Sequence, residues 1–183
     1  MLKKRELQDA PTLYDLMTHP QVFPYVRHKA YSLDEFYFLT KQTMEAEENG
    51  ELISRTIMDE YHQPIGTINL FDVKNKSGFL ATWIGQPYFG KGYNKMAKEE
   101  FLEELFLSHE MEAVFIKIRK TNTRSLKAAL KLPYISLGNI LYPDVYDMIN
   151  GDSSVYDLFV ITKEQYMIHR ELVANISEDE AVV

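Results

Sequence analysis

Apolar and polar positions follow a helical period at the start of the chain and a strand period further on. A first helix is expected over residues 9–19, with Pro11 in its first turn and apolar side chains three and four positions apart. The capping-box sequence Ser32-Leu33-Asp34-Glu35 predicts a second helix, which ends near Asn49-Gly50. Residues 2–8 come before both helices and are expected to form a short edge strand.

From Leu52 onward the apolar runs are short and rich in β-branched and aromatic residues, which is typical of strands. Polar turns separate the first three runs, so we expect these to pair as an antiparallel meander. A long amphipathic helix, another strand and a helix that begins near Asn122 come next. The predicted strands are 52–58, 65–71, 79–84, 113–118, 135–142 and 155–162, the last two joined by an acidic loop, and the last helix is 164–172.

The third of these strands runs into a turn with closely spaced glycines, in the sequence Trp83-Ile84-Gly85-Gln86-Pro87-Tyr88-Phe89-Gly90-Lys91-Gly92-Tyr93-Asn94. A strand, a turn of small residues and a helix leave several backbone N–H groups unpaired at the helix N-terminus, which favours an anion site. Taken alone, such glycines more often serve only to allow a positive φ or close packing. The surroundings favour the anion site, because the following helix repeats apolar residues at Ala97, Phe101 and Leu105.

This order of elements predicts the α+β class, with a mixed, mostly antiparallel sheet that splays near the glycine turn and helices on both faces. A chain of 183 residues with 45% hydrophobic residues is long enough for one domain with a substantial core and too short for two ordinary ones. We therefore expect a single domain over residues 1–172. Residues 173–183 form an acidic tail that is expected to fray.

Composition excludes several kinds of function. The net charge of −7 opposes binding to nucleic acid, and no basic stripe overrides it. The chain has no cysteine, and its five histidines are scattered without metal-ligand spacing, so no metal site is expected. No apolar run approaches membrane-spanning length, which predicts a cytoplasmic protein without a membrane partner. The sequence leaves a monomer or a homodimer open.

The order of the elements and two of the turns resemble the GNAT acetyltransferases, and among them the ribosomal-protein N-terminal acetyltransferases. The resemblance covers nearly all of residues 1–172. Gly90-Lys91-Gly92-Tyr93 matches the glycines of the family motif Gln/Arg-x-x-Gly-x-Gly/Ala, whose leading position is Pro87 here. The resemblance implies that backbone amides of this turn bind the pyrophosphate of acetyl-CoA. The expected cofactor-binding residues here are Trp83, Ile84, Gly85, Phe89, Gly90, Lys91, Gly92, Tyr93 and Asn94.

A second match is Asn122-Thr123-Arg124-Ser125, which is similar to the Asn-x-x-Ser that follows the fifth strand of the family. The resemblance implies that Asn122 and Ser125 face the pantetheine arm of the cofactor, and an amide side chain offers both a donor and an acceptor. The alternative is that Asn122 or Thr123 only caps a helix. Two motifs in the family order, each at a strand-to-helix junction, favour the cofactor site.

The sequence departs from the family at its acid and base positions. Phe79 stands where many relatives have a glutamate, and Ala129 stands where many have the tyrosine that protonates the departing thiolate. We therefore expect Ser125 to act as the acid, with Tyr134 in reserve. Backbone N–H groups near Trp83 and Ile84 are the expected oxyanion donors, and water is a candidate base relay.

The resemblance implies an enzyme that transfers an acetyl group from acetyl-CoA, without a metal, to a primary amine by direct attack. The alternative is a non-catalytic acyl-CoA-binding module that has lost its acid and base groups. The resemblance also implies that the acceptor enters beside residues 23–31 and 143–154. Aromatic and acidic residues in these segments suit a cationic acceptor, and they are Tyr25, Tyr31, Asp144, Asp147 and Asp152.

Overall fold

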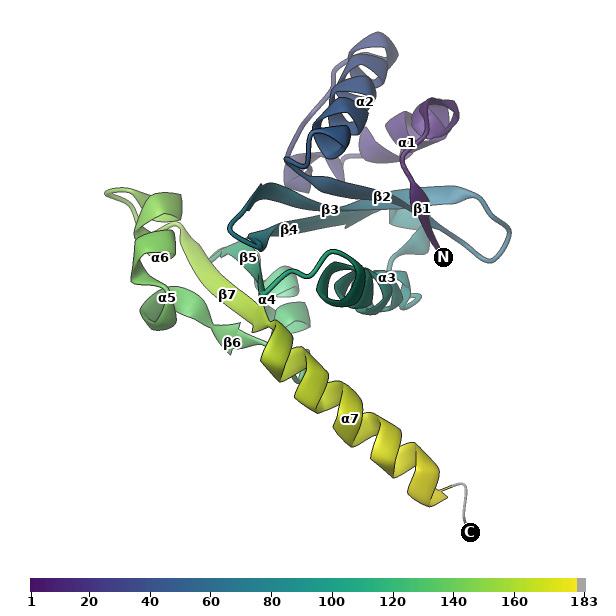
Figure 1. Cartoon of the computed structure of the whole chain (residues 1–183). Coiled ribbons are helices and arrows are strands. Elements are labelled where there is room, and N and C mark those ends of the chain that lie inside the picture. Colours follow the sequence, from purple (N-terminus) through teal and green to yellow (C-terminus); the bar gives the residue numbers. More distant parts are fainter. Residues whose placement is uncertain (181–183) are drawn as a thin grey trace. The chain divides into compact units, whose positions relative to one another are not determined.

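The structure is a computed structural model that describes residues 1–180 (Figure 1). The described chain forms two compact units, of which the first is Met1–Glu110 and the second begins at Met111. The prediction of one domain over residues 1–172 stays a prediction, and the two units are described separately below.

The first unit contains a four-stranded sheet in the order β1-β2-β3-β4. Its strands are β1 (Leu2–Lys4), β2 (Ile53–Met58), β3 (Pro64–Lys74) and β4 (Ser77–Ile84). All neighbouring strands pair antiparallel, and Thr67 lies opposite Trp83. The meander predicted from the polar turns is therefore confirmed.

Helices cover both faces of this sheet (Figure 1). One face carries α1 (Ala10–Met17) and α2 (Leu33–Glu48), and the other carries α3 (Tyr93–Glu103). The capping box is confirmed, because the Ser32 hydroxyl accepts a hydrogen bond from the Glu35 N–H at 3.1 Å. Short 3-10 turns complete the unit, which are η1 (Leu7–Asp9), η2 (Phe23–Tyr25) and η3 (Gln86–Tyr88), together with a π-helical segment, η4 (Glu104–Ser108), that continues α3.

The two faces of the sheet differ in chemistry. Residues directly opposite each other in an antiparallel pair point to the same face. The face toward α3 includes Ile57, Ile68 and Leu70, all fully buried, and one buried charge, Arg55, which is paired with Glu104. The face toward α2 instead buries polar side chains of β2 and β3, which are Ser54, Thr56, Thr67 and Asn69. The apolar residues of α1 and α2 cover only part of this face, so polar side chains of the sheet lie beneath these two helices.

The second unit contains the antiparallel strands β5 (Ala113–Arg119), β7 (Tyr156–Thr162) and β6 (Ser136–Leu137), in the order β5-β7-β6. Its helices are α4 (Thr123–Ala129), α5 (Gly138–Leu141), α6 (Pro143–Asn150) and α7 (Lys163–Glu180). Helices and mostly antiparallel strands in both units confirm the α+β class.

Two predictions for this unit are wrong. Residues 135–142 form a strand only at Ser136–Leu137, because the Asn139 side chain accepts the Leu158 N–H at 2.8 Å in place of a backbone partner. The acidic loop after it is helical over Pro143–Asn150. Proline suits the first turn of a helix, and Asp144 complements the positive end of its dipole.

The ends of the chain also differ from the prediction. Strand β1 stops at Lys4 and not at residue 8, since residues 7–9 form the turn that leads into α1. Helix α7 continues to Glu180, although it was expected to end at Leu172 before a frayed tail. No glycine or proline interrupts residues 163–180, so nothing in the local sequence stops the helix. Residues 181–183 of the predicted tail lie outside the described residues.

Candidate active site

The glycine turn joins β4 to α3 within the first unit. After Ile84 the chain passes through the short 3-10 turn η3, which the sequence did not predict. Gly90 and Gly92 then adopt left-handed conformations, with φ of 75° and 86°. A Cβ built on either glycine would meet no atom within 4 Å. The backbone here is open to a ligand, and its conformation disfavours any other residue.

Gly92 is the N-cap of α3 and offers no side chain to its first turn. The N–H groups of a first helical turn have no partner inside the helix, so here they face outward uncapped. Together with the helix dipole they attract negative charge. The core side of α3 is as predicted, because Ala97 and Phe101 are fully buried, as is Leu105 in η4, which continues the helix. This anchoring fixes the direction in which the amides point.

Aromatic and charged side chains surround the turn. The ring of Tyr88 lies 5.9 Å from that of Tyr93, edge to face, and the Lys91 ammonium lies 5.5 Å from the Tyr88 ring centre. The Tyr93 hydroxyl donates a hydrogen bond to Glu60, which raises the pKa of Tyr93 to about 12. Tyr93 therefore stays protonated at neutral pH and ties the start of α3 to the β2–β3 loop.

The second motif lies in the second unit, at the start of α4. The Asn122 side-chain oxygen accepts the Ser125 N–H at 3.2 Å, so Asn122 is the N-cap of α4. The capping role that the sequence offered as an alternative is thus present. It uses the amide oxygen and leaves the role of the Asn122 NH₂ group toward a cofactor as a prediction. Ser125 is half-buried beside it.

Tyr134, the reserve acid, is 4% exposed. Its ring lies 5.3 Å from the rings of both Tyr166 and His169 on α7. The side chain therefore belongs to the packing between the segment after α4 and α7. The catalytic assignments of Ser125 and Tyr134 stay predictions.

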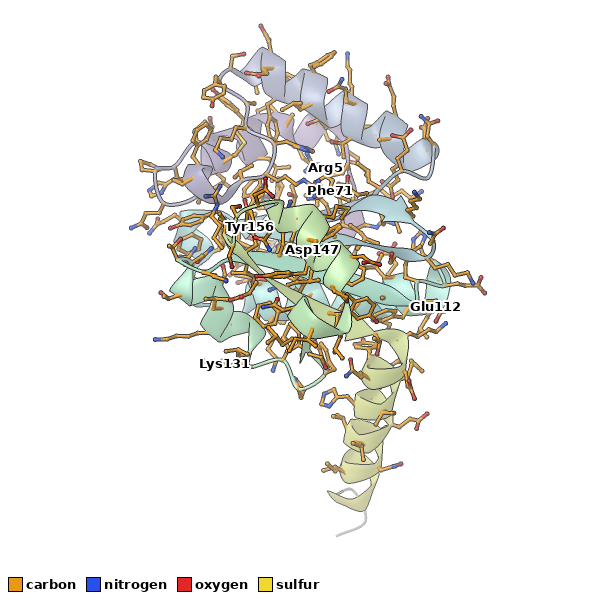
Figure 2. The ribbon with its side chains drawn as sticks, turned by 90° about the vertical axis from the view of Figure 1, so that its left-hand side faces the viewer. Arg5, Phe71, Glu112, Lys131, Asp147 and Tyr156 are labelled. Carbon is orange, nitrogen blue, oxygen red and sulfur yellow. The ribbon has the colours of Figure 1, made fainter. Side chains whose placement is uncertain are left out.

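The predicted acceptor residues are exposed. Tyr25 and Tyr31 of the first unit are 58% and 75% exposed, and the Tyr31 ring lies edge-on to Phe23 at 5.5 Å. Asp144 and Asp147 are exposed on α6, where Figure 2 labels Asp147, and Asp152 follows the helix. Because these acids and tyrosines belong to different units, their joint role in binding an acceptor stays a prediction.

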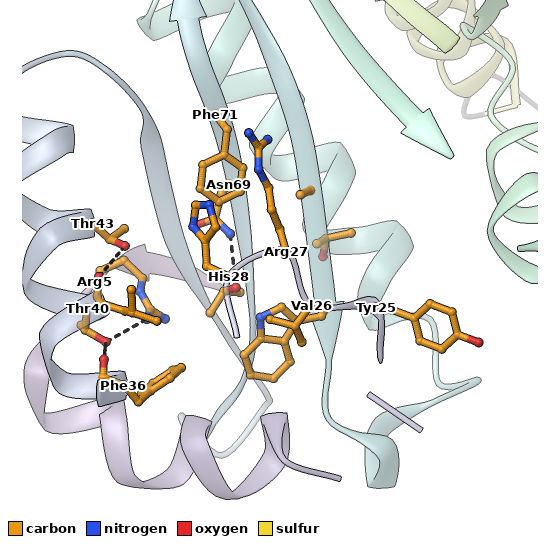
Figure 3. Close-up of a pocket in the computed structure, with 15 residues that line it drawn as sticks. Arg5, Tyr25, Val26, Arg27, His28, Phe36, Thr40, Thr43, Asn69 and Phe71 are labelled. Atoms are coloured by element: carbon orange, nitrogen blue, oxygen red, sulfur yellow. Dashed lines mark hydrogen bonds between the residues drawn. The ribbon is translucent and has the colours of Figure 1, made fainter. Parts of the chain in front are cut away.

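A pocket that the sequence did not predict lies in the first unit, between α2, the 25–28 segment and strands β3 and β4 (Figure 3). It has a volume of about 70 Å³. Trp83, one of the expected cofactor residues, lines it. The ring of Tyr25 reaches its rim but points away from it (Figure 3). The pocket therefore adjoins the end of β4, from which the chain enters the glycine turn.

His28 and Arg27 form one wall of this pocket. The His28 ring lies edge-on to Phe71 at 5.1 Å, and the Arg27 guanidinium lies over the same ring at 4.4 Å. Burial and the charge of Arg27 lower the pKa of His28 against the opposing effect of Asp72. The His28 imidazole is therefore neutral at pH 7 and is able to accept a proton.

Sequence reasoning missed Arg5, His28 and Asn69 as pocket residues. The available signal was a pair of polar residues two positions apart, Thr67 and Asn69, within residues 65–71, a run otherwise predicted as a buried strand. The sequence around Arg5 does not indicate that this residue is buried, because its burial depends on the packing of α2 against the sheet. Within the described residues no helix is long and apolar enough to cross a membrane.

Comparison with known proteins gives the family. The model of the acetyltransferase (GNAT) domain matches residues 1–134. An uncharacterised N-acetyltransferase, p20, from Bacillus licheniformis is 25% identical over 172 residues, which are 90% of this chain and 93% of that protein.

Two solved structures show the same fold. Spermidine N-acetyltransferase from Vibrio cholerae, in complex with CoA and spermine, has a TM-score of 0.71 and 14% identity, and the match covers 91% of this chain and 97% of that one. Ribosomal-protein-S5-alanine acetyltransferase from Vibrio fischeri has a TM-score of 0.69 and 13% identity, with 90% and 93% covered. The chain belongs to the GNAT acetyltransferases, a family that uses acetyl-CoA, and it is an N-acetyltransferase that acts on an amine.

Proposed function

We propose that the glycine turn binds the diphosphate of acetyl-CoA and that the acceptor, a primary amine, enters the pocket beside Trp83. The observation that carries this proposal is the open, left-handed turn at the N-terminus of α3, which directly follows the strand that lines the pocket. Acetyl-CoA supplies an activated thioester carbonyl, and the residues of the chain bind, orient and move protons around it.

The chain contributes four kinds of group in this proposal. Backbone amides over Phe89–Asn94 hold negative charge, and Lys91 adds a positive side chain there. Backbone N–H groups near Trp83 and Ile84 stabilise the charge that develops on the carbonyl oxygen. The Ser125 hydroxyl protonates the departing thiolate, with Tyr134 in reserve. Because a protonated amine cannot attack, the pocket also has to accept a proton, for which neutral His28 is suited.

The acceptor is cationic in water, as primary amines are at neutral pH. The exposed carboxylates of Asp144, Asp147 and Asp152 support electrostatic recruitment of such a molecule. The spermidine acetyltransferase among the neighbours also acts on a cation. The same proposal places the enzyme in the cytoplasm, as a monomer or homodimer, which fits a chain without cysteine.

Thiol release tests the proposal directly. The protein is mixed with acetyl-CoA and a panel of primary amines, and free CoA thiol is measured beside the cofactor affinity from calorimetry. We expect thiol release that depends on at least one amine. Tight cofactor binding without release on any amine contradicts the proposal and favours the non-catalytic module, which Phe79 and Ala129 keep open.

Asn122 provides a test that separates capping from cofactor binding. Aspartate caps a helix as well as asparagine does, but it lacks the NH₂ donor, whereas alanine lacks both groups. We expect Asn122→Asp to weaken acetyl-CoA binding with little change in thermal stability. Asn122→Ala is expected to weaken binding and also to destabilise the protein by about 1 kcal/mol. Wild-type cofactor affinity in Asn122→Asp, measured by calorimetry, would show that Asn122 only caps α4.

A further inference from the structure

The polar side chains beneath α1 and α2 surround a buried positive charge. Arg5 is 8% exposed and lines the pocket. Figure 3 shows its guanidinium group directed from the side of α2 into the space between Phe36, His28 and Asn69. Arginine is among the residues that are almost never fully buried without a partner. The kind of ligand that suits the pocket therefore depends on whether the N–H donors of Arg5 have acceptors within the protein.

The described residues leave this guanidinium group largely unsatisfied. Its Nη2 donates to the Thr40 hydroxyl at 3.5 Å, a long hydrogen bond. Thr40 in turn donates its proton to the Phe36 carbonyl at 2.8 Å, so its oxygen is free to accept. The buried Nη1 of Arg5 has no hydrogen-bond partner among the described residues. An arginine carries five N–H donors, and the two on Nη1 are left without an acceptor among these residues.

Among the described residues, no carboxylate is paired with the Arg5 guanidinium group. Among the described residues that line the pocket there is no aspartate or glutamate. Asp9 is the nearby acid, and its carboxylate accepts from the Lys3 ammonium at 3.0 Å and from the Thr56 hydroxyl at 3.5 Å. Asp72, beside the pocket, is paired with Arg27 at 2.7 Å. Both acids are thus held by other partners.

The charge of Arg5 persists in this environment. Burial lowers the pKa of Arg5 to about 10, against the attraction of Asp9, so the group stays protonated at neutral pH. A buried charge without a hydrogen-bonded counterion is costly, and a pocket that keeps one is suited to an anion. The planar fork of a guanidinium group matches a carboxylate with two parallel hydrogen bonds.

The size of the pocket limits the anion. A cavity of about 70 Å³ has room for about five to seven water-sized groups, at 10–15 Å³ for each. A carboxylate with the first carbons of its chain fits this space, and the pocket is open enough for the rest of the molecule to extend out of it. The remaining lining groups near Arg5 are neutral donors and acceptors, Thr67 and Asn69, so a single negative charge balances the site.

We infer that the acceptor is a small amino acid, in which a carboxylate paired with Arg5 holds the molecule while its primary amine receives the acetyl group. The inference rests on the proposed function and names the substrate class of the same site. Binding the carboxylate satisfies the free N–H donors of Arg5 and neutralises its charge. A polyamine has no group that does so, although it carries the same kind of amine.

Matched pairs of amines test the inference on the unmodified protein. Lysine and cadaverine differ only in the carboxylate, as do ornithine and putrescine. We expect kcat/KM to be about 10- to 100-fold higher for each amino acid than for its decarboxylated partner, as for loss of one charge-assisted hydrogen-bonded pair. Equal or higher kcat/KM for cadaverine and putrescine overturns the inference but leaves the proposed function standing. No turnover of any amine overturns the proposed function itself.

A second pair distinguishes the source of the negative charge. β-Alanine and phosphoethanolamine carry an amine on a two-carbon chain, with a carboxylate or a phosphate at the other end. A carboxylate site built around one guanidinium group is expected to favour β-alanine. Preference for phosphoethanolamine would show that the pocket recognises phosphate and would contradict the assignment to amino acids.

Substitution of Arg5 tests its part in the preference. Arg5→Met keeps a long side chain without charge and is expected to bring the lysine-to-cadaverine ratio of kcat/KM close to one. Lys4→Met is the matched control, because it removes an exposed charge at the neighbouring position and is expected to keep the ratio. Arg5→Lys retains the charge and is expected to keep part of the preference. If Arg5→Met lowers only the melting temperature and the ratio stays unchanged, Arg5 has a structural role alone and the inference is wrong.

Discussion

Gly90→Val is expected to weaken acetyl-CoA binding by about 100-fold or more while the protein remains folded. Gly90 has a φ of 75°, a conformation that a β-branched residue strongly disfavours. Valine therefore forces the turn into another conformation and redirects the amides that are proposed to hold the diphosphate. The loss of two hydrogen bonds from backbone amides to the charged diphosphate, at about 1.5–3 kcal/mol each, accounts for an effect of this size.

Gly50→Val is the control for backbone strain. Gly50 follows the C-terminus of α2, has the same φ of 75° and also has no atom within 4 Å of a built Cβ. Both variants are thus expected to lose similar amounts of stability in urea unfolding. Only Gly90→Val should lose affinity in calorimetry with acetyl-CoA. Equal affinities in the two variants would show that the turn does not bind the cofactor.

The glycine turn was predictable because its signals are local. An apolar strand, two glycines and an amphipathic helix stand next to each other in the sequence, and each restricts the backbone of its own segment. The 3-10 turn at Gln86–Tyr88 was missed because no periodicity marks three residues. The resemblance to the GNAT acetyltransferases added the expected ligand, which local patterns do not give.

The segment after Tyr134 shows where local patterns fail. Residues 135–142 are apolar enough for a strand, yet the Asn139 side chain takes the hydrogen bond that would have continued the pairing with β7. A side chain that replaces a backbone partner has no periodic signature. The same limit applies to α6, whose start at Pro143 is readable only once the preceding strand is known to be short.

The pocket was missed for a different reason. Its guanidinium group comes from Arg5 and its opposite wall from β3, more than sixty residues later in the chain. Sequence rules place an arginine at the surface, and only the folded unit shows that α2 buries it. A residue that is buried by segments distant in the sequence therefore gives no local signal, and such residues are the hardest part of a site to predict from the sequence.

Gly66→Ala is expected to disrupt both the sheet and the proposed acceptor pocket. A Cβ on Gly66 would lie 2.2 Å from the Trp83 carbonyl oxygen and 2.9 Å from the Ile84 Cα. Both atoms belong to the backbone of β4, so no side-chain movement relieves the contact. The strands have to separate where Trp83 lines the pocket, and overpacking of this kind costs about 1–3 kcal/mol.

Gly85→Ala is the control for the loss of stability in Gly66→Ala. It shows how much of that loss comes from the added methyl group itself. Its Cβ would lie 2.7 Å from Leu16 Cδ2, the end of a flexible side chain that can rotate away. Urea unfolding should therefore show a clearly larger loss of unfolding free energy for Gly66→Ala than for Gly85→Ala. The amine dependence of thiol release should also weaken in Gly66→Ala, because the displaced Trp83 backbone changes the pocket wall. Wild-type stability in Gly66→Ala would mean that β3 and β4 do not approach each other this closely, and the assignment of Trp83 to the pocket would fall with it.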